Sequence, residues 1–172
     1  VIEPTTKKLE TLQKIEQLPN ILDICVVSTC ADVRCFLMKK LATTRNVKNF
    51  LVEKFLFQRV EDYDIVGKLL REKKIDTRVN CHFRSIEPYR SIKRKLLKCG
   101  RCKMTISGDN WGLASNGVHY IDLFLFLTSS RRFFVEKSEL NWELSETKRE
   151  GFVEFSGEII GANSNGDSLT MI

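Results

Sequence analysis

Apolar runs alternate with amphipathic segments through the first half of the chain. Residues 21–27, 49–52 and 77–81 are predicted to be strands. The first of these runs is nearly continuous in apolar and β-branched side chains, a pattern typical of a parallel strand that is covered on both faces. A further strand, residues 1–4, is predicted to end on Glu3. The polar residues that close these runs are therefore the first candidates for a binding edge.

Helices are predicted between these strands. Three segments, residues 5–18, 31–41 and 60–73, repeat apolar side chains at helical spacing. The repeating positions are Leu9, Leu12, Ile15 and Leu18, then Val33, Phe36, Leu37 and Leu41, and finally Ile65, Val66, Leu69 and Leu70, the last set facing inward. Because strand and helix alternate and crossovers are right-handed, the sequence predicts a doubly wound parallel sheet.

The pattern changes after Arg84. A basic helix, a short strand and a very apolar helix are followed by three segments that alternate apolar and polar residues as antiparallel strands do. These elements are predicted at residues 88–98, 103–107, 116–127, 133–140, 152–160 and 168–172. The fold class is thus α/β: a Rossmann-type parallel sheet in residues 1–86, incomplete at its N-terminus, and an α+β domain with a mostly antiparallel open sheet in residues 87–172.

Composition limits the partners and the compartment. The net charge of +6 comes from 28 basic and 22 acidic residues, and the densest basic run, Lys93 to Lys103, has no interleaved aromatic residues for stacking on bases. We therefore expect a solvated helix face and no nucleic-acid partner. The longest apolar run, residues 121–127, is far shorter than the roughly 20 residues of a membrane span. No membrane partner is expected.

The six cysteines lack the spacing of a disulfide framework, and several lie inside apolar runs. This usage predicts a reducing, cytoplasmic compartment. Cys99 and Cys102 form a single C-x-x-C motif without a second pair or well-spaced histidines. No metal site is therefore expected.

Lys54 is the first residue at which we expect chemistry. It follows a short apolar strand and Glu53. Open α/β sheets bind their ligands in the crevice outside the carboxyl ends of the strands. A lysine there can polarise an oxygen atom of a substrate.

Glu3, Ser28 and Thr29 are candidate nucleotide contacts. An acidic residue that closes the second strand of a dinucleotide-binding sheet hydrogen-bonds the ribose hydroxyls and disfavours the extra phosphate of NADP. Ser28 and Thr29 lie where a strand meets its helix, a place where amides and hydroxyls touch nucleotides. The alternatives are an ordinary exposed glutamate and a simple helix cap. No G-x-G-x-x-G fingerprint occurs in the chain.

His119 is the second chemical candidate. A lone histidine before an apolar helical segment is often a core residue, but it can also take a hydroxyl proton near neutral pH. With a lysine close by, such a histidine is suited to the oxidation of an alcohol. Asp122, three residues later, either orients His119 or caps a helical turn.

The order of these signals is more specific than any one of them. Four segments follow one another: Asp23-Ile24-Cys25-Val26-Val27-Ser28-Thr29, Leu51-Val52-Glu53-Lys54, Val79-Asn80-Cys81-His82-Phe83-Arg84 and Gly117-Val118-His119-Tyr120-Ile121-Asp122-Leu123. Together they resemble the Gfo/Idh/MocA oxidoreductases, the family of glucose-fructose oxidoreductase and inositol dehydrogenase. Residues 145–157 resemble the carboxy-terminal sheet of that family, so the resemblance covers almost the whole chain.

The resemblance implies a function and a set of site residues. A hydride would pass between nicotinamide and a hydroxyl-bearing carbon of a sugar, polyol or nucleotide sugar. Lys54 would bind the reacting hydroxyl and His119 would take part in proton transfer. The implied cofactor contacts are Glu3, Ser28, Thr29, Glu53 and Lys54, and the implied substrate contacts are Asn80, Arg84, Asn116 and His119. NAD is expected as the cofactor rather than NADP. The resemblance also implies that the protein forms a homodimer or homotetramer through the C-terminal sheet.

Three positions depart from the family pattern. Phe55 stands where the family has the proline of Glu-Lys-Pro, and Cys30 stands where a proline commonly follows the threonine. Ser115 stands where many active members have an aspartate that completes the catalytic group, and a serine cannot supply that charge. Two functions therefore stay open: an NAD(P)-dependent dehydrogenase acting on CH–OH groups, or a non-catalytic family member that serves as a cofactor-binding or assembly module.

Overall fold

The computed structural model describes residues 10–147 and 151–172, which divide into two compact units between Val79 and Asn80. Each unit contains a hydrophobic core of its own. The sequence pattern predicted the boundary between the two domains after residue 86. The residues between these two points, including Arg84, belong to the second unit.

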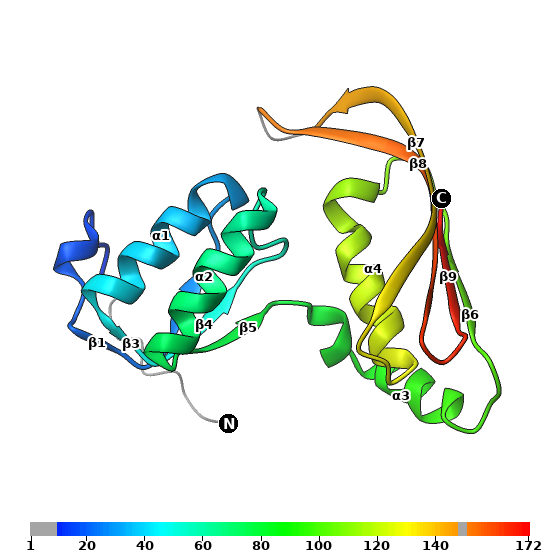
Figure 1. Ribbon diagram of the computed structural model, residues 1–172, viewed down its shortest axis with the longest axis horizontal. Coiled ribbons are helices and arrows are strands. Elements are labelled where there is room, and N and C mark those ends of the chain that lie inside the picture. The colour runs from blue at the N-terminus through cyan, green and yellow to red at the C-terminus, as the bar shows by residue number, and fades with distance from the viewer. Residues whose placement is uncertain (1–9, 148–150) are drawn as a thin grey trace. The chain divides into compact units, whose positions relative to one another are not determined.

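The first unit alternates strands and helices in the predicted order. Strands β2, β4 and β5 form a parallel three-stranded sheet in that spatial order, and β1 pairs with β3, also parallel. The elements are η1 (Ile15–Gln17), β1 (Ile21–Leu22), β2 (Cys25–Val27), α1 (Ala31–Thr44), β3 (Asn46–Val47), β4 (Asn49–Val52), α2 (Val60–Lys73) and β5 (Asp76–Val79). The predicted Rossmann-type α/β arrangement is confirmed (Figure 1).

Two predicted elements of this unit differ from the structure. The sequence predicts an α-helix over residues 5–18. Within residues 10–18, the part of this segment that the structure describes, only the short 3₁₀ turn Ile15–Gln17 forms, so the prediction is wrong there. Apolar residues at a constant spacing of three drift around an α-helix, which has 3.6 residues per turn, so they do not form a straight apolar stripe along it. The run 21–27 is divided at Asp23, whose carbonyl accepts a hydrogen bond from the Asn49 side chain (2.8 Å).

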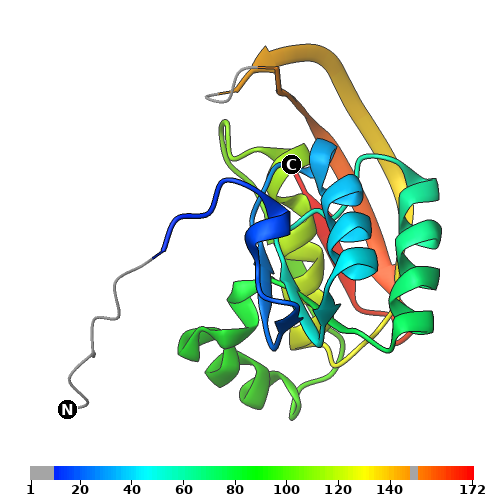
Figure 2. The ribbon, with the colours of Figure 1, turned by 90° about the vertical axis from the view of Figure 1, so that its left-hand side faces the viewer.

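Both helices of the first unit cover the same face of the sheet. The strand order steps in one direction from β2 to β4 to β5, and two right-handed crossovers in one direction place both helices on one side. Figures 1 and 2 show α1 and α2 side by side. On the opposite face Val26 of β2 is 61% exposed, and its pairing partner Leu51 of β4 is 37% exposed. The prediction that the strand of residues 21–27 is covered on both faces is therefore wrong for the described residues.

The second unit packs helix α4 against a mixed sheet. Its sheet has the order β6-β9-β8-β7, in which β6 and β9 are parallel and the other pairs are antiparallel. Helix α4 contributes Phe124 to a core shared with Leu169 and Met171 of β9. The elements are η2 (His82–Ser85), α3 (Glu87–Leu96), β6 (Lys103–Ile106), α4 (Leu113–Leu127), β7 (Phe133–Glu146), β8 (Val153–Asn163) and β9 (Ser168–Met171). The predicted α+β arrangement is confirmed.

A carboxylate from the sheet caps helix α4. Gly112 precedes the helix in the left-handed region (φ 78°) and offers no side chain for capping. The carboxylate of Glu154, on β8, accepts hydrogen bonds from the backbone amides of Ala114 (2.5 Å) and Ser115 (3.1 Å). Amides in the first turn lack partners within the helix and carry partial positive charge, so an anion there is stabilising. Glu154 therefore fixes the start of α4 to the sheet.

Replacing Glu154 with alanine should lower the free energy of unfolding by about 1–2 kcal/mol, because two helix amides lose their acceptor. Glu154→Gln should cost less, since an amide oxygen still accepts a hydrogen bond. Urea unfolding followed by circular dichroism measures both. Glu143→Ala, at an exposed position of β7, is the matched control. Equal unfolding midpoints for Glu154→Ala and Glu143→Ala would contradict the capping role.

Candidate functional site

The parallel strands of the first unit end at one level. Val27 of β2 pairs with Val52 of β4, and Val52 pairs with Val79 of β5. The pairing continues one residue further, because the Glu53 amide donates to the Val27 carbonyl oxygen (3.1 Å). The loop after β2 and the loop after β4 therefore leave the sheet side by side. These are the loops that carry Thr29 and Lys54.

The predicted residues of this edge differ in exposure. Ser28 is exposed, and Thr29, Glu53 and Lys54 are half-buried. The hydroxyl oxygen of Thr29 is buried and has no hydrogen-bond partner among the described residues. An unsatisfied buried hydroxyl is costly, and a polar ligand at the start of α1 would satisfy it. This feature fits a nucleotide contact at Thr29. Glu3 lies outside the described residues.

Arg34 is a residue of this edge that sequence reasoning missed. It lies on the first turn of α1 and is only 2% exposed. Its guanidinium donates to the carbonyl oxygens of Thr29, Glu53, Phe55 and Leu56. Burial lowers the pKa of Arg34. The apolar pattern of the helix pointed instead to Val33 and Phe36, which are 48% and 69% exposed.

In the second unit, His119 is buried in an aromatic cluster. It lies on α4 and is 7% exposed. Its ring centroid is 5.0 Å from that of His82 and 5.4 Å from that of Phe83, both on η2. The apolar surroundings keep bulk water away from the imidazole, and His82 itself is exposed.

Asp122 pairs with Arg84 rather than capping a helical turn. The Arg84 Nε atom donates to Asp122 Oδ2 at 2.7 Å, and a second Arg84 nitrogen donates to Oδ1. The hydrogen bonds to Asp122 raise the pKa of Arg84 above its usual value. The pair ties η2 to α4, and η2 carries the two aromatic rings that contact His119. Asp122 thus orients the surroundings of His119 through Arg84.

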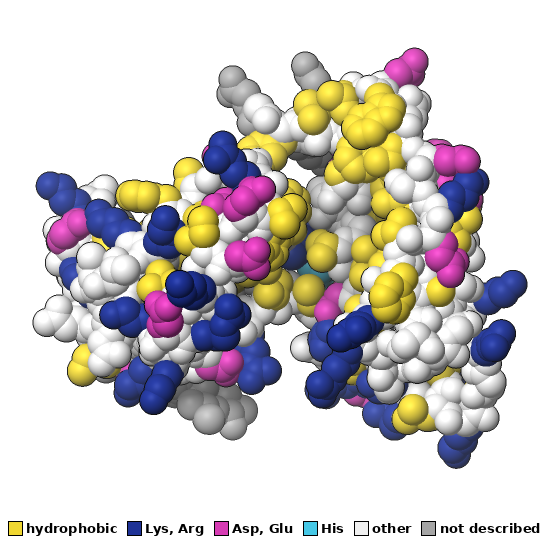
Figure 3. All heavy atoms as spheres, viewed as in Figure 1, with side chains coloured by type: hydrophobic (Ala, Val, Ile, Leu, Met, Phe, Trp, Pro, Cys, Tyr) yellow, Lys and Arg dark blue, Asp and Glu magenta, His cyan; other side chains and the backbone are white. Residues whose placement is uncertain are grey.

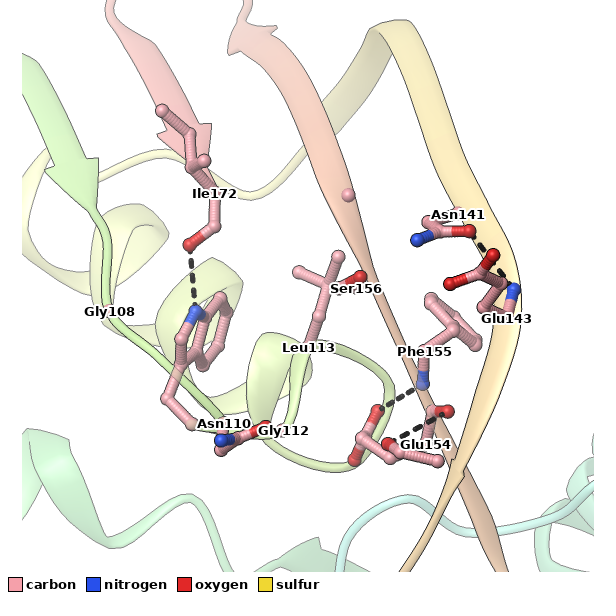
Figure 4. Close-up of a pocket in the computed structure, with 13 residues that line it drawn as sticks. Gly108, Asn110, Gly112, Leu113, Asn141, Glu143, Glu154, Phe155, Ser156 and Ile172 are labelled. Carbon is pink, nitrogen blue, oxygen red and sulfur yellow. Dashed lines mark hydrogen bonds between the residues drawn. The ribbon is translucent and has the colours of Figure 1, made fainter.

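The start of α4 forms one wall of a cavity of about 220 Å³. It is lined by the loop before α4, strand β7, strand β8 and Ile172, the residue that follows β9 (Figure 4). The loop is held by the Trp111 indole, which donates to the Ile172 carbonyl oxygen (2.8 Å), and by Asn116, whose amide donates to the Trp111 carbonyl oxygen (2.7 Å). No local sequence pattern indicates this cavity, because β7 and β8 reach it from distant parts of the chain. Its polar lining includes Asn110, Asn141, Glu143, Ser145, Glu154 and Ser156.

The remaining predicted residues fall at separate places. Asn80 is the first residue of the second unit and is half-buried. Ser115 and Asn116 lie in the first turn of α4. The pairing of Lys54 with His119 joins residues of two units and stays a prediction.

All six cysteines are free thiols. Across residues 10–147 and 151–172, no group of three or more His, Cys, Asp and Glu side chains has the arrangement of a metal site. In the same part of the chain, none of the helices has both the length and the apolar character needed to cross a membrane.

Comparisons with known proteins give a result at the level of the fold. No protein-family model matches the sequence, and no curated protein matches it. Solved structures do match. GenD2 from gentamicin A biosynthesis, in complex with NAD, superposes with a TM-score of 0.67 at 14% identity, covering 86% of this chain and 46% of GenD2.

Two further structures show the range of proteins with this fold. The dehydrogenase MviM from Clostridium difficile has a TM-score of 0.65 at 17% identity and covers 87% of this chain and 48% of its own. A super-repressor mutant of Gal80p from Saccharomyces cerevisiae has a TM-score of 0.65 at 15% identity, with coverage of 87% and 49%. The chain spans about half the length of the structures it matches. Its fold is that of the Gfo/Idh/MocA-type oxidoreductases, as the order of the sequence motifs predicted.

Proposed function

We propose that the protein is an NAD-dependent oxidoreductase that transfers a hydride between nicotinamide and a hydroxyl-bearing carbon of a sugar, polyol or nucleotide sugar. The observation that carries this proposal is the place of Lys54, half-buried just after β4 where the parallel strands end together. Ligands of open α/β sheets bind at that edge. The same fold binds NAD in GenD2 and belongs to a dehydrogenase in MviM.

Ser28, Thr29, Glu53 and Lys54 are proposed to contact the cofactor from the edge of the first unit, together with Glu3. When bound, NAD supplies the acceptor for the hydride. The buried hydroxyl of Thr29 supports this set, because it needs a polar partner.

Lys54 and His119 are proposed to handle the substrate hydroxyl. The Lys54 ammonium would donate a hydrogen bond to the reacting oxygen and stabilise the negative charge that develops on it. His119, which is 7% exposed, would accept or return the proton. Asn80, Arg84 and Asn116 are proposed to contact the substrate, with Arg84 oriented by Asp122.

Lys54→Ala should lower kcat by about 10²–10⁴-fold, the range that a positioned proton-transfer or charge-stabilising group contributes. The full-length protein is incubated with NAD and a panel of sugars, polyols and nucleotide sugars, and the absorbance of reduced nicotinamide is followed. Lys68→Ala, at an exposed position on α2, is the control and should retain the wild-type rate. Bound NAD without turnover on any member of the panel would count against the enzyme.

NAD should bind more tightly than NADP, because the carboxylate of Glu3 would repel the additional phosphate. Paired calorimetric titrations of the full-length protein measure both dissociation constants. Glu3→Gln should narrow the difference between them. A preference of the wild-type protein for NADP would remove Glu3 from the ribose site.

A second candidate function is a non-catalytic cofactor-binding or assembly module. Ser115 favours it, because no carboxylate is available at that position four residues before His119. The likeness to Gal80p, a repressor, is consistent with it. The Lys54→Ala variant separates the two functions, since a binding module would keep its partner while an enzyme would lose most of its rate.

We propose that the protein is cytoplasmic. Its six cysteines are all free thiols, and three of them, Cys25, Cys35 and Cys102, have pKa values raised mainly by burial. Thiols of this kind are typical of a reducing compartment.

A homodimer or homotetramer through the C-terminal sheet is also proposed. Apolar side chains gather along the ribbon of β7 and β8 (Figure 3), including Trp142 (75% exposed), Leu144 (55%) and Val153 (56%). Contiguous exposed apolar surface of this kind marks interaction sites. It is consistent with self-association through β7 and β8.

Trp142→Asp should shift the protein from an oligomer to a monomer in sedimentation velocity, because an aspartate would be buried unpaired in the interface. Phe36→Asp, at a position of α1 that is 69% exposed, is the control and should leave the oligomer intact. A wild-type monomer, or an unchanged sedimentation coefficient for Trp142→Asp, would rule out this interface.

A further inference from the structure

Arg34 is a buried cation in a place that disfavours one. It lies on the first turn of α1, where the helix dipole already carries positive charge, and only 2% of it is exposed. Long charged side chains are almost never fully buried without partners, because removing the charge from water is costly. The partners of Arg34 therefore indicate why it is tolerated.

Those partners are backbone carbonyl oxygens from the two loops that leave the binding edge. Nη2 donates to Thr29, in the loop after β2. Nη1 donates to Glu53 (2.9 Å), Phe55 and Leu56 (3.1 Å), all in the loop after β4. One guanidinium thus joins two segments that are separated in sequence. A planar donor group with several N–H bonds in fixed directions is suited to this task.

Lys54 lies between the carbonyl groups that Arg34 holds. The Glu53 carbonyl belongs to the peptide plane that also contains the Lys54 amide nitrogen, and the Phe55 carbonyl belongs to the second plane after it. Fixing both planes restricts the backbone dihedral angles of Lys54 and with them the direction of its side chain. After Leu56 the loop is anchored again, because Phe57 is buried in the core (4% exposed).

Neither loop has a covalent restraint of its own. The three prolines of the chain are Pro4, Pro19 and Pro88, so the residues around Thr29 and Lys54 contain none. Proline fixes φ near −65°, whereas Cys30 and Phe55 leave that angle free to vary. The hydrogen bonds of Arg34 act on the carbonyl just before Cys30 and on the carbonyl of Phe55. They restrain both loops where no ring does.

We propose that Arg34 is a positioning residue for Lys54: its guanidinium fixes the loop after β4 against the loop after β2, so that the Lys54 amine is held toward the reacting hydroxyl. The role of the amine rests on the proposed oxidoreductase function, whereas the ordering of the loop does not. In this scheme Arg34 acts through its hydrogen bonds to backbone carbonyl oxygens and does not contact the substrate.

The test compares Arg34→Lys with Arg45→Lys in the full-length protein. Arg45 follows the other end of α1 and also donates to backbone carbonyls, those of Ile15 (2.9 Å) and Leu18 (3.2 Å). It is therefore a matched control away from the Lys54 loop. Arg34→Gln, which removes the charge and keeps one donor group, is the second variant in case the lysine variant does not fold.

Hydrogen exchange measured by mass spectrometry reports how well the loop after β4 is ordered, independently of any enzymatic activity. Peptides that contain residues 53–57 should exchange about tenfold faster or more in Arg34→Lys or Arg34→Gln, and at the wild-type rate in Arg45→Lys, since a lost local restraint raises the population of open states. Unchanged exchange in both Arg34 variants would overturn the proposal, even if the protein has no dehydrogenase activity.

Measurements of kcat test whether Arg34 acts through Lys54. Arg34→Lys should lower kcat about 10- to 100-fold, the cost of a small misplacement of a catalytic group. In a Lys54→Ala background the same change should have almost no further effect on kcat, because the group it positions is gone. An equal loss of kcat in both backgrounds would assign Arg34 a general structural role and overturn the proposal.

Discussion

The pairing register of β2, β4 and β5 is the constraint on which the chemistry of the first unit depends. Side chains alternate between the two faces of a strand, so a shift of one residue in β4 would turn Phe50 and Val52 out of the core and bring Leu51 in. The same shift would move Lys54 along the edge by one residue. The burial of Phe50 and Val52, at 1% and 0% exposure, therefore sets the position of a charged residue that belongs to neither strand nor core.

The second unit fixes its candidate residue differently. His119 lies on a helix that is anchored by charge on both sides of it: Glu154 holds the amide of Ser115, one turn before, and Arg84 holds the carboxylate of Asp122, one turn after. A helix with two such anchors cannot rotate about its axis without breaking one of them. The sheet and η2 together thus determine which way the imidazole faces.

Much of the fold was predictable because it depends on local pattern. The range of α2, Val60–Lys73, and the starts of β6 and β7 follow from apolar spacing and were predicted as the structure has them. Helix α4 starts three residues earlier than its pattern indicated, at Leu113, because a glycine in the left-handed region and a distant carboxylate determine its first turn. Neither effect has a signature in the local sequence.

The candidate site was only partly predictable for the same reason. Lys54 and His119 were predicted from the sequence because each lies beside the end of a recognisable pattern, an apolar strand for Lys54 and an apolar helix for His119. Arg34 was missed because an arginine among apolar residues of a helix is normally exposed, and its burial depends on four carbonyls that only the folded loops bring together. The cavity beside α4 depends likewise on β7 and β8, whose lining residues are far from Trp111 in sequence.

The strand order β6-β9-β8-β7 has a consequence for how the second unit folds. Strand β9, residues Ser168–Met171, lies between β6 and β8 and is the last of the four in the chain. Strand β6 can pair with β9 only after the intervening α4, β7 and β8 have been synthesised. Bringing these distant segments together costs loop-closure entropy before any pairing compensates for it. During synthesis, β7 and β8 can pair early, whereas β6 stays without β9 until residues 168–171 have left the ribosome.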